Sequence, residues 1–241
     1  RYYLRSVDGF VYMSEQVRGE LKAYTDAPAL FSPHPLFENF GERVERSEAC
    51  VRLGLDPANR YALFFGLIRD YKGLDLLLDA WARLRRAGRT EGRRLIVAGE
   101  FYTAREPYLN RIADNGLQDE VLLHDRFIPD DDVKYYFSAA DFVVQPYKTA
   151  TQSGVTQIAY QFCVPMVVTK VGGLAEIVPD GRVGYVCEPT PEGVAGAIER
   201  MYEGDTLQRF RENCVEERRR FSWEEMCSRI TELYGLVASG K

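Results

Sequence analysis

From Tyr61 onward, short apolar runs alternate with longer amphipathic segments, and this rhythm constrains the fold more than any other feature of the sequence. The first apolar run, residues 61–66 (YALFFG), is typical of a buried strand. Leucines and a tryptophan then recur at helical spacing over residues 74–84, and Gly88 marks the expected end of that helix. Strands that alternate with helices form βαβ units, so the sequence predicts an α/β fold with a parallel sheet covered on both faces.

The same alternation continues to the end of the chain. Further strands are predicted over residues 95–99, 121–123, 142–146, 165–169 and 184–187. The intervening helices are expected over about 106–115, from Pro129 through Phe137, over 155–162, and after the last strand, where two or three helices finish the chain. The expected architecture is a Rossmann-like, doubly wound parallel sheet.

The first 60 residues do not form a complete unit of this kind. Residues 10–14 read as a strand that feeds a short helix, and residues 28–40, with three prolines, read as an extended connection. One strand and one helix cannot bury a core alone. We therefore interpret this part as the remnant of a preceding α/β domain, and the absence of an initial Met fits a piece of a longer protein.

Charge and cysteine content exclude several functional classes. A net charge of -5 does not favour binding to nucleic acid, so we expect no such partner. The five cysteines are an odd, widely spaced set without a CxxC pair, which fits reduced thiols in the cytoplasm better than disulfides or a structural metal. No apolar run reaches the roughly 18–20 residues of a membrane span, and the N-terminus is not a signal peptide.

Two cations follow the first predicted strand, in the loop 66–73 (GLIRDYKG). Ligands of open parallel sheets bind at the carboxyl ends of the strands, and a helix N-terminus there favours an anion. Arg69 and Lys72 are therefore candidates to bind a diphosphate. The alternative for this loop alone is a pair of solvated surface charges.

Other loops at the same edge carry polar groups. After the fourth strand, residues 149–156 (TATQSGVT) supply hydroxyls, an amide and a glycine just before a helix, where backbone amides can hold phosphate oxygens. A simple Ser or Thr helix cap is the alternative. Gly99-Glu100 follows the second strand, and Gly172-Gly173 with Glu176 follows the fifth; helix-dipole pairing would explain Glu176 equally well.

Together, these motifs resemble a GT-B glycosyltransferase of glycosyltransferase family 4 (group 1). The resemblance rests on the strand-loop-Lys-Gly pattern of residues 65–73, the Gly99-Glu100 turn, the segment 146–165 and the Gly-Gly-x-x-Glu of residues 172–176, over roughly residues 61–188. It implies the C-terminal, donor-binding domain of that fold. The implied division is residues 1–34 as the end of an N-terminal acceptor-side domain, 35–60 as an interdomain linker, 61–220 as the nucleotide-sugar-binding domain and 221–241 as a C-terminal helix.

The resemblance further implies a retaining transferase of polysaccharide biosynthesis that needs no metal or other cofactor. It would move a sugar from a nucleotide diphosphate sugar, with UDP as the default carrier, to a hydroxyl acceptor that is lipid-linked or a glycan, with peripheral membrane contact as a further expectation. Lys72 and Arg69 would be catalytic, because they stabilise the leaving diphosphate. The implied donor-binding residues are Gly66, Glu100, Phe127, Gln152, Ser153, Gly154, Val155, Thr156, Gln157 and Glu176.

This sequence departs from the family pattern at two places. Leu67 stands where the family usually has an arginine, which leaves Arg69 as the substitute. The two family glutamates are also missing: their positions hold Thr151 or Gln152, and then Ala159 or Tyr160. A non-catalytic nucleotide-sugar-binding or interaction module is therefore the alternative function, and a GT-B epimerase is a third. Because domain closure would assemble the reaction site, we expect this chain alone to be inactive.

Three further features favour structural explanations. The aspartates 130–132 are expected to open a helix rather than bind a metal, and His124 is expected to be a structural histidine. The arginine cluster of residues 83–94 reads as a solvated helix face, with anionic lipid headgroups or a partner as the alternative.

Overall fold

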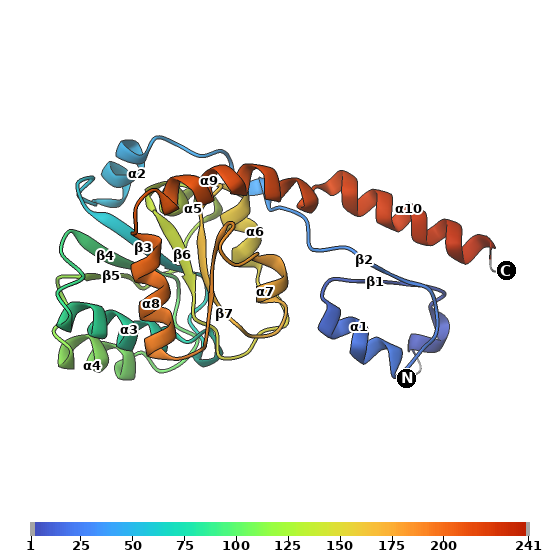
Figure 1. Ribbon diagram of the computed structural model, residues 1–241, viewed down its shortest axis with the longest axis horizontal. Helices are drawn as coiled ribbons and strands as arrows, with labels where there is room; N and C mark the ends of the chain where they lie inside the picture. The colour runs from blue at the N-terminus through green and yellow to red at the C-terminus, as the bar shows by residue number, and fades with distance from the viewer. Residues whose placement is uncertain (1–2, 240–241) are drawn as a thin grey trace.

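The computed structural model describes residues 3–239, which form a six-stranded parallel sheet joined to a smaller N-terminal unit (Figure 1). The sheet order is β5-β4-β3-β6-β7-β8, and every neighbouring pair is parallel. The strands are β3 (Arg60–Phe65), β4 (Arg93–Ala98), β5 (Val121–His124), β6 (Phe142–Gln145), β7 (Met166–Thr169) and β8 (Gly184–Cys187). The chain reverses its direction of winding between β3 and β6, which is where doubly wound sheets bind their ligands.

Helices cover both faces of this sheet. One layer contains α3 (Leu74–Arg86), α4 (Glu106–Asp114) and α8 (Pro191–Met201), with α3 packed on both other helices. The other contains α2 (Arg46–Leu53), α5 (Asp130–Ala139) and α6 (Gly154–Gln161). The helix α9 (Thr206–Glu217) contacts both layers, because it packs on α8 and on α6 and buries Phe210 in one half of the core and Cys214 in the other. The predicted Rossmann-like fold is therefore confirmed.

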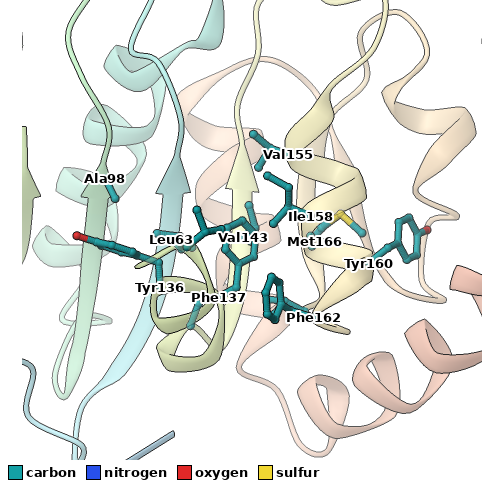
Figure 2. Packing of buried hydrophobic residues seen from close by; sticks show 14 of the residues in the cluster. Leu63, Ala98, Tyr136, Phe137, Val143, Val155, Ile158, Tyr160, Phe162 and Met166 are labelled. Atoms are coloured by element: carbon teal, nitrogen blue, oxygen red, sulfur yellow. The ribbon is translucent and has the colours of Figure 1, made fainter. Parts of the chain in front are cut away.

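Successive side chains of each strand point to opposite faces of the sheet, and this alternation divides the core into two halves. On β3, Ala62 and Phe64 face the α3 and α8 layer, whereas Tyr61 and Leu63 face the α5 and α6 layer. Figure 2 shows the second half, where side chains of α5 and α6 pack on the sheet. The strands are buried on both faces, which explains why their sequences are continuous apolar runs rather than alternating ones.

The N-terminal unit is a parallel pair of short strands with one helix. It consists of β1 (Phe10–Tyr12), α1 (Glu15–Lys22) and β2 (Ala29–Phe31), after a short 3-10 helix η1 (Tyr3–Ser6). The sequence analysis predicted β1 and α1 but read β2 as part of an extended connection. The C-terminal helix α10 (Trp223–Ser239) crosses back to this unit after η4 (Arg218–Phe221) and packs on β1 and β2 (Figure 1).

Residues 35–60 are packed more closely on the sheet domain than an extended linker requires. They contain η2 (Glu38–Phe40) and α2, and α2 packs along α5. Leu36, Ala49, Cys50 and Leu55 are buried in the same core half as Leu63. The sequence analysis missed α2, and the proposed domain boundaries stay a prediction.

No helix within residues 3–239 is both long and apolar enough to cross a membrane.

Candidate functional site

Two adjoining cavities lie at the carboxyl edge of the sheet and share Phe40, Phe65 and Gly66. The first, of about 300 Å³, is called here the cation lobe because it contains Lys72. The second, of about 190 Å³, is called the apolar lobe. The cation lobe is lined by Phe37, Phe40, Phe65, Gly66, Tyr71, Lys72, Tyr147, Gln152, Ser153, Gly154, Val155 and Ile158. The apolar lobe is lined by Phe40, Phe65, Gly66, Leu67, Gly99, Glu100, Phe127, Ile128, Asp130 and Val133.

Glycine is required where these lobes meet. Gly66 has φ +95°, and a Cβ there would lie 3.2 Å from the Lys72 Nζ and 3.7 Å from the Val155 side chain. Gly99 has φ +147°, and its Cβ would lie 2.1 Å from the Gly66 carbonyl oxygen. Because these two glycines have no side chains, the loops after β3 and β4 can approach closely. The Ile68 amide donates a hydrogen bond to the Glu100 carbonyl and so links the two loops.

Lys72 is a buried cation, and within residues 3–239 no carboxylate forms an ion pair with it. Its side chain is 9% exposed and ends η3 (Asp70–Lys72), and its Nζ lies 5.8 Å from the centroid of the Tyr147 ring. Burial, with a smaller contribution from Arg69, lowers the pKa of Lys72 to about 8, and within residues 3–239 no carboxylate contributes to that shift. A charge buried in this way is costly unless a ligand supplies the opposite sign.

The N-terminus of α6 faces the same lobe. Ser153 is its N-cap: the hydroxyl accepts from the Val155 amide at 3.2 Å and shares a hydrogen bond of 3.1 Å with the Tyr147 hydroxyl. Tyr147 is buried, which raises the pKa of its hydroxyl, so this group stays neutral. The Thr156 hydroxyl donates back to the Ser153 carbonyl inside the helix and has no exposed surface. The first backbone amides of α6 and the positive end of its dipole therefore point toward the region of Lys72, as an anion site requires.

The structure gathers most of the predicted donor-binding residues in these two lobes. Gly66, Gln152, Ser153, Gly154 and Val155 line the cation lobe with Lys72. Glu100 and Phe127 line the apolar lobe, where the Phe127 ring is 65% exposed.

Arg69 lies close by but points outward. Its side chain is exposed, and its guanidinium lies 5.2 Å from the centroid of the Tyr102 ring. It is near enough to Lys72 to lower the pKa of that lysine. The two predicted catalytic cations are thus neighbours, one buried and one at the surface.

Gln157 and Glu176 take other positions. Gln157 is 1% exposed, and neither polar atom of its amide has a hydrogen-bond partner within the described part of the chain. The Glu176 carboxylate accepts from the Glu15 amide at 3.0 Å, at the N-terminus of α1. It lines a separate cavity of about 530 Å³ between the N-terminal unit, η4 and α10. Its predicted contact with the donor sugar stays a prediction.

At the positions of the two family glutamates, the described part of this chain places no carboxylate in the cation lobe. Neither register for the second glutamate reaches the cavity, because Ala159 and Tyr160 have no exposed surface and the Tyr160 hydroxyl donates to the Ile177 carbonyl. None of the described residues that line the cation lobe is acidic. The lobe is walled instead by aromatic rings.

Four of these aromatic residues were missed by the sequence analysis. Phe37 and Phe40 come from the segment read as a linker, Tyr71 lies inside the loop 66–73, and Tyr147 precedes the loop 149–156. For the tyrosines, their place beside Lys72 and after a strand was an available signal. For the phenylalanines, the only sequence signal was a pair of aromatic residues three apart after a proline-rich stretch.

The features that were given structural explanations have structural partners. The aspartates 130–132 form the first turn of α5, and the His124 Nδ1 lies 2.8 Å from the Tyr136 hydroxyl. In the arginine cluster, Arg83 pairs with Glu192 and Arg89 with Glu199. Within residues 3–239, no group of three or more His, Cys, Asp or Glu side chains is arranged to hold a metal ion.

Fold and site together define a class: a doubly wound α/β unit with a cation and a helix N-terminus at the carboxyl edge of its sheet, where proteins of this architecture bind their ligands. The sequence profile of the family described as "Glycosyl transferases group 1" matches residues 59–204. The chain belongs to this family.

Curated relatives agree with this assignment. D-inositol 3-phosphate glycosyltransferase 2 of Catenulispora acidiphila is 32% identical over 202 residues, which cover 79% of this chain and 46% of that protein. Lipopolysaccharide core biosynthesis mannosyltransferase LpsB of Rhizobium meliloti is 30% identical over 195 residues, which cover 75% of this chain and 50% of LpsB. The chain thus spans about half the length of these relatives.

Solved structures show the same fold at low sequence identity. Sucrose-phosphate synthase from Thermosynechococcus elongatus aligns with a TM-score of 0.82 and 20% identity, over 98% of this chain and 59% of that one. Anabaena Alr3699/HepE, in complex with UDP and glucose, aligns with a TM-score of 0.74 and 19% identity, over 95% of this chain and 63% of that one.

Proposed function

We propose that this chain is the donor-binding part of a retaining glycosyltransferase of family 4 type, and that it binds a nucleotide diphosphate sugar at the carboxyl edge of its sheet. The single observation that carries the proposal is Lys72: a buried ammonium group, without a carboxylate partner among residues 3–239, beside the N-terminus of α6. A diphosphate supplies the missing negative charge and accepts hydrogen bonds from the helix amides.

The same groups account for catalysis. When the bond between the anomeric carbon and the diphosphate oxygen breaks, its electron pair stays on that oxygen, and negative charge develops next to Lys72. A pKa of about 8 leaves this lysine protonated in most molecules at pH 7, so a positive charge is already in place to stabilise the leaving diphosphate. Arg69 adds a second cation at the surface. Retention requires the acceptor oxygen to bond to the anomeric carbon on the face that the diphosphate leaves, and the proton of the acceptor hydroxyl passes to the departing diphosphate oxygen.

The neighbours support the donor and acceptor classes that we propose. UDP is our proposed carrier, supported by the UDP complexes of Alr3699/HepE. The relatives named for inositol phosphate and for lipopolysaccharide core support a hydroxyl acceptor on a polyol or glycan. We propose that two protein cations take the charge-stabilising role without a metal, and that the protein acts in the cytoplasm, where its unpaired cysteines stay reduced.

Calorimetric titration of the 241-residue chain with UDP, GDP and ADP tests the proposal. Binding of one diphosphate should weaken by about 1–3 kcal/mol in Lys72→Ala and by less in the exposed Arg69→Ala. Lys22→Ala, at the end of α1, is the matched control and should bind normally. If none of the three nucleotides binds to the wild type, the proposed function is wrong.

Turnover is a separate question. Because domain closure assembles the reaction site in such enzymes, we propose that this chain binds the donor but does not turn over alone. A coupled assay for UDP release with UDP-sugar and simple alcohols should show no multiple turnover. Sustained release above the rate of spontaneous hydrolysis would contradict this part of the proposal.

A further inference from the structure

Two phenylalanines from the segment before β3 line the candidate donor site. Phe37 and Phe40, at the start and end of η2, line the cation lobe, and Phe40 also lines the apolar lobe. Their ring centroids are 6.0 Å apart. We call these two side chains the aromatic flap.

The flap is anchored before any ligand binds. On its N-terminal side the Leu36 amide donates to the Phe221 carbonyl at 3.0 Å, and on its C-terminal side the Val44 amide donates to the Ser138 hydroxyl at 3.1 Å. The Phe37 ring stacks on His34 with centroids 4.8 Å apart. A segment held at both ends presents its rings at a low entropic cost, because little ordering remains for binding.

Phe37 packs directly on the phosphate-binding end of α6. A Cβ built at Gly154 would lie 3.3 Å from the Phe37 ring, so the flap sits against the first residue of this helix. The diphosphate position defined by Lys72 and Ser153 is therefore bordered by the flap. Phe40 lines both lobes, so a group attached to that diphosphate and extending into the apolar lobe would lie near its ring.

The chemistry of the apolar lobe selects which group enters it. Its described lining is mainly apolar, with Leu67, Phe127 and Ile128 beside the two shared rings; its charged members are the carboxylates of Glu100 and Asp130, and it contains no lysine or arginine. The lobe therefore offers aromatic and aliphatic surface, and its described lining holds no cation for a phosphate. A nucleobase has two apolar faces and stacks on aromatic rings.

From these contacts we propose that the aromatic flap binds the nucleoside part of the donor: Phe40 stacks on the base or ribose at the junction of the two lobes, and Phe37 holds Phe40 in place. The proposal rests on the proposed function and names residues that discriminate a nucleoside diphosphate from a bare diphosphate. Phe40 is the binding residue, and Phe37 is a positioning residue that acts through it.

The test compares two ligands that differ only by the nucleoside. UDP and inorganic pyrophosphate are titrated calorimetrically into the wild-type chain, Phe40→Leu, Phe37→Leu and Lys72→Met. Loss of one stacked ring should weaken UDP binding roughly 5- to 100-fold in Phe40→Leu. Pyrophosphate binding should stay within about twofold of wild type. Lys72→Met should weaken both ligands.

Two controls separate binding from folding. Phe40→Tyr keeps the ring and should keep UDP binding, while the circular dichroism spectrum and Tm show that each variant is folded at the titration temperature. Trp223→Leu removes an exposed ring of α10 that lines neither lobe, and UDP binding should not change.

The failures are distinguishable. If the wild type binds UDP but Phe40→Leu binds it equally well, the flap is not the nucleoside site and the proposed function stands. If Phe40→Leu loses UDP and pyrophosphate alike, Phe40 supports the anion site instead, and the inference is overturned. If the wild type binds none of UDP, GDP, ADP and pyrophosphate, the proposed function fails and the inference fails with it.

Discussion

Replacing Lys72 by methionine should make the unliganded protein more stable, not less. Folding lowers the pKa of this lysine from its ordinary value of 10.5 to about 8, mainly through burial. Because each pKa unit corresponds to about 1.4 kcal/mol, the buried charge destabilises the fold by up to about 3 kcal/mol when both folded and unfolded chains are protonated. Met fills a similar volume without a charge. We therefore expect Lys72→Met to raise the free energy of unfolding at pH 7 by up to that amount.

The pH dependence identifies the cause. Below pH 8 the destabilisation is complete; between pH 8 and 10.5 the unfolded chain binds more protons than the folded one, so the wild type gains stability as the pH rises. The advantage of Lys72→Met should therefore shrink across this window and vanish above it.

Urea unfolding at pH 7, 9 and 10.5 measures the effect, and a thermal scan at pH 7 should show a Tm higher by about 6–12 °C at most. Lys22→Met, which changes an exposed lysine, is the control and should stay within about 0.5 kcal/mol of wild type at each pH. A Lys72→Met variant that is less stable than wild type at pH 7, or whose advantage does not change with pH, refutes the reasoning.

Three further substitutions test local geometry. Cys163 follows the C-cap of α6 and has φ +51°, a backbone conformation that strains residues other than glycine. Cys163→Gly should therefore raise the free energy of unfolding by about 0.5–1 kcal/mol in urea titrations, and a lower free energy would contradict this account. Gly73 has φ +69°, and a Cβ there would lie 1.9 Å from the Pro146 carbonyl oxygen. Gly73→Ala should therefore lower the free energy of unfolding by more than about 2 kcal/mol, and an unchanged free energy would show that the loop can shift. Glu176→Ala removes the acceptor of the Glu15 amide, so it should lower the free energy of unfolding by about 0.5–1 kcal/mol and leave the affinity for UDP unchanged. If the variant binds a UDP-sugar more weakly but binds UDP normally, that result would support the predicted sugar contact.

The sheet domain could be predicted from sequence because local and global signals agree there. The six strands are buried on both faces, so each appears as an apolar run, and the helices between them show clear periodicity. The N-terminal 60 residues lack this redundancy. The helix α2 buries only Ala49 and Cys50, too few to give an amphipathic pattern, and β2 has three residues whose pairing with β1 is not encoded locally.

The site was predictable where a residue's position relative to a strand fixes its location. Lys72 and the segment 152–155 follow β3 and β6, whose carboxyl ends are neighbours, so their meeting is a consequence of topology. Phe37 and Phe40 reach the same lobe by tertiary packing, through hydrogen bonds of their segment to Phe221 and Ser138. Contacts of that kind connect residues far apart in sequence and leave no local pattern to read.

The unliganded site is energetically incomplete, and this couples its occupancy to stability. Lys72 lacks a counter-charge among the described residues, and the apolar lobe leaves Phe127 largely exposed. A nucleoside diphosphate supplies both a negative charge and an apolar face. At 100 times its dissociation constant such a ligand stabilises the folded chain by about 2.7 kcal/mol, close to the cost assigned to the buried lysine. UDP should therefore raise the Tm of the wild type toward that of Lys72→Met, whose own Tm should hardly respond, because the variant has gained stability by giving up the charge that the ligand needs.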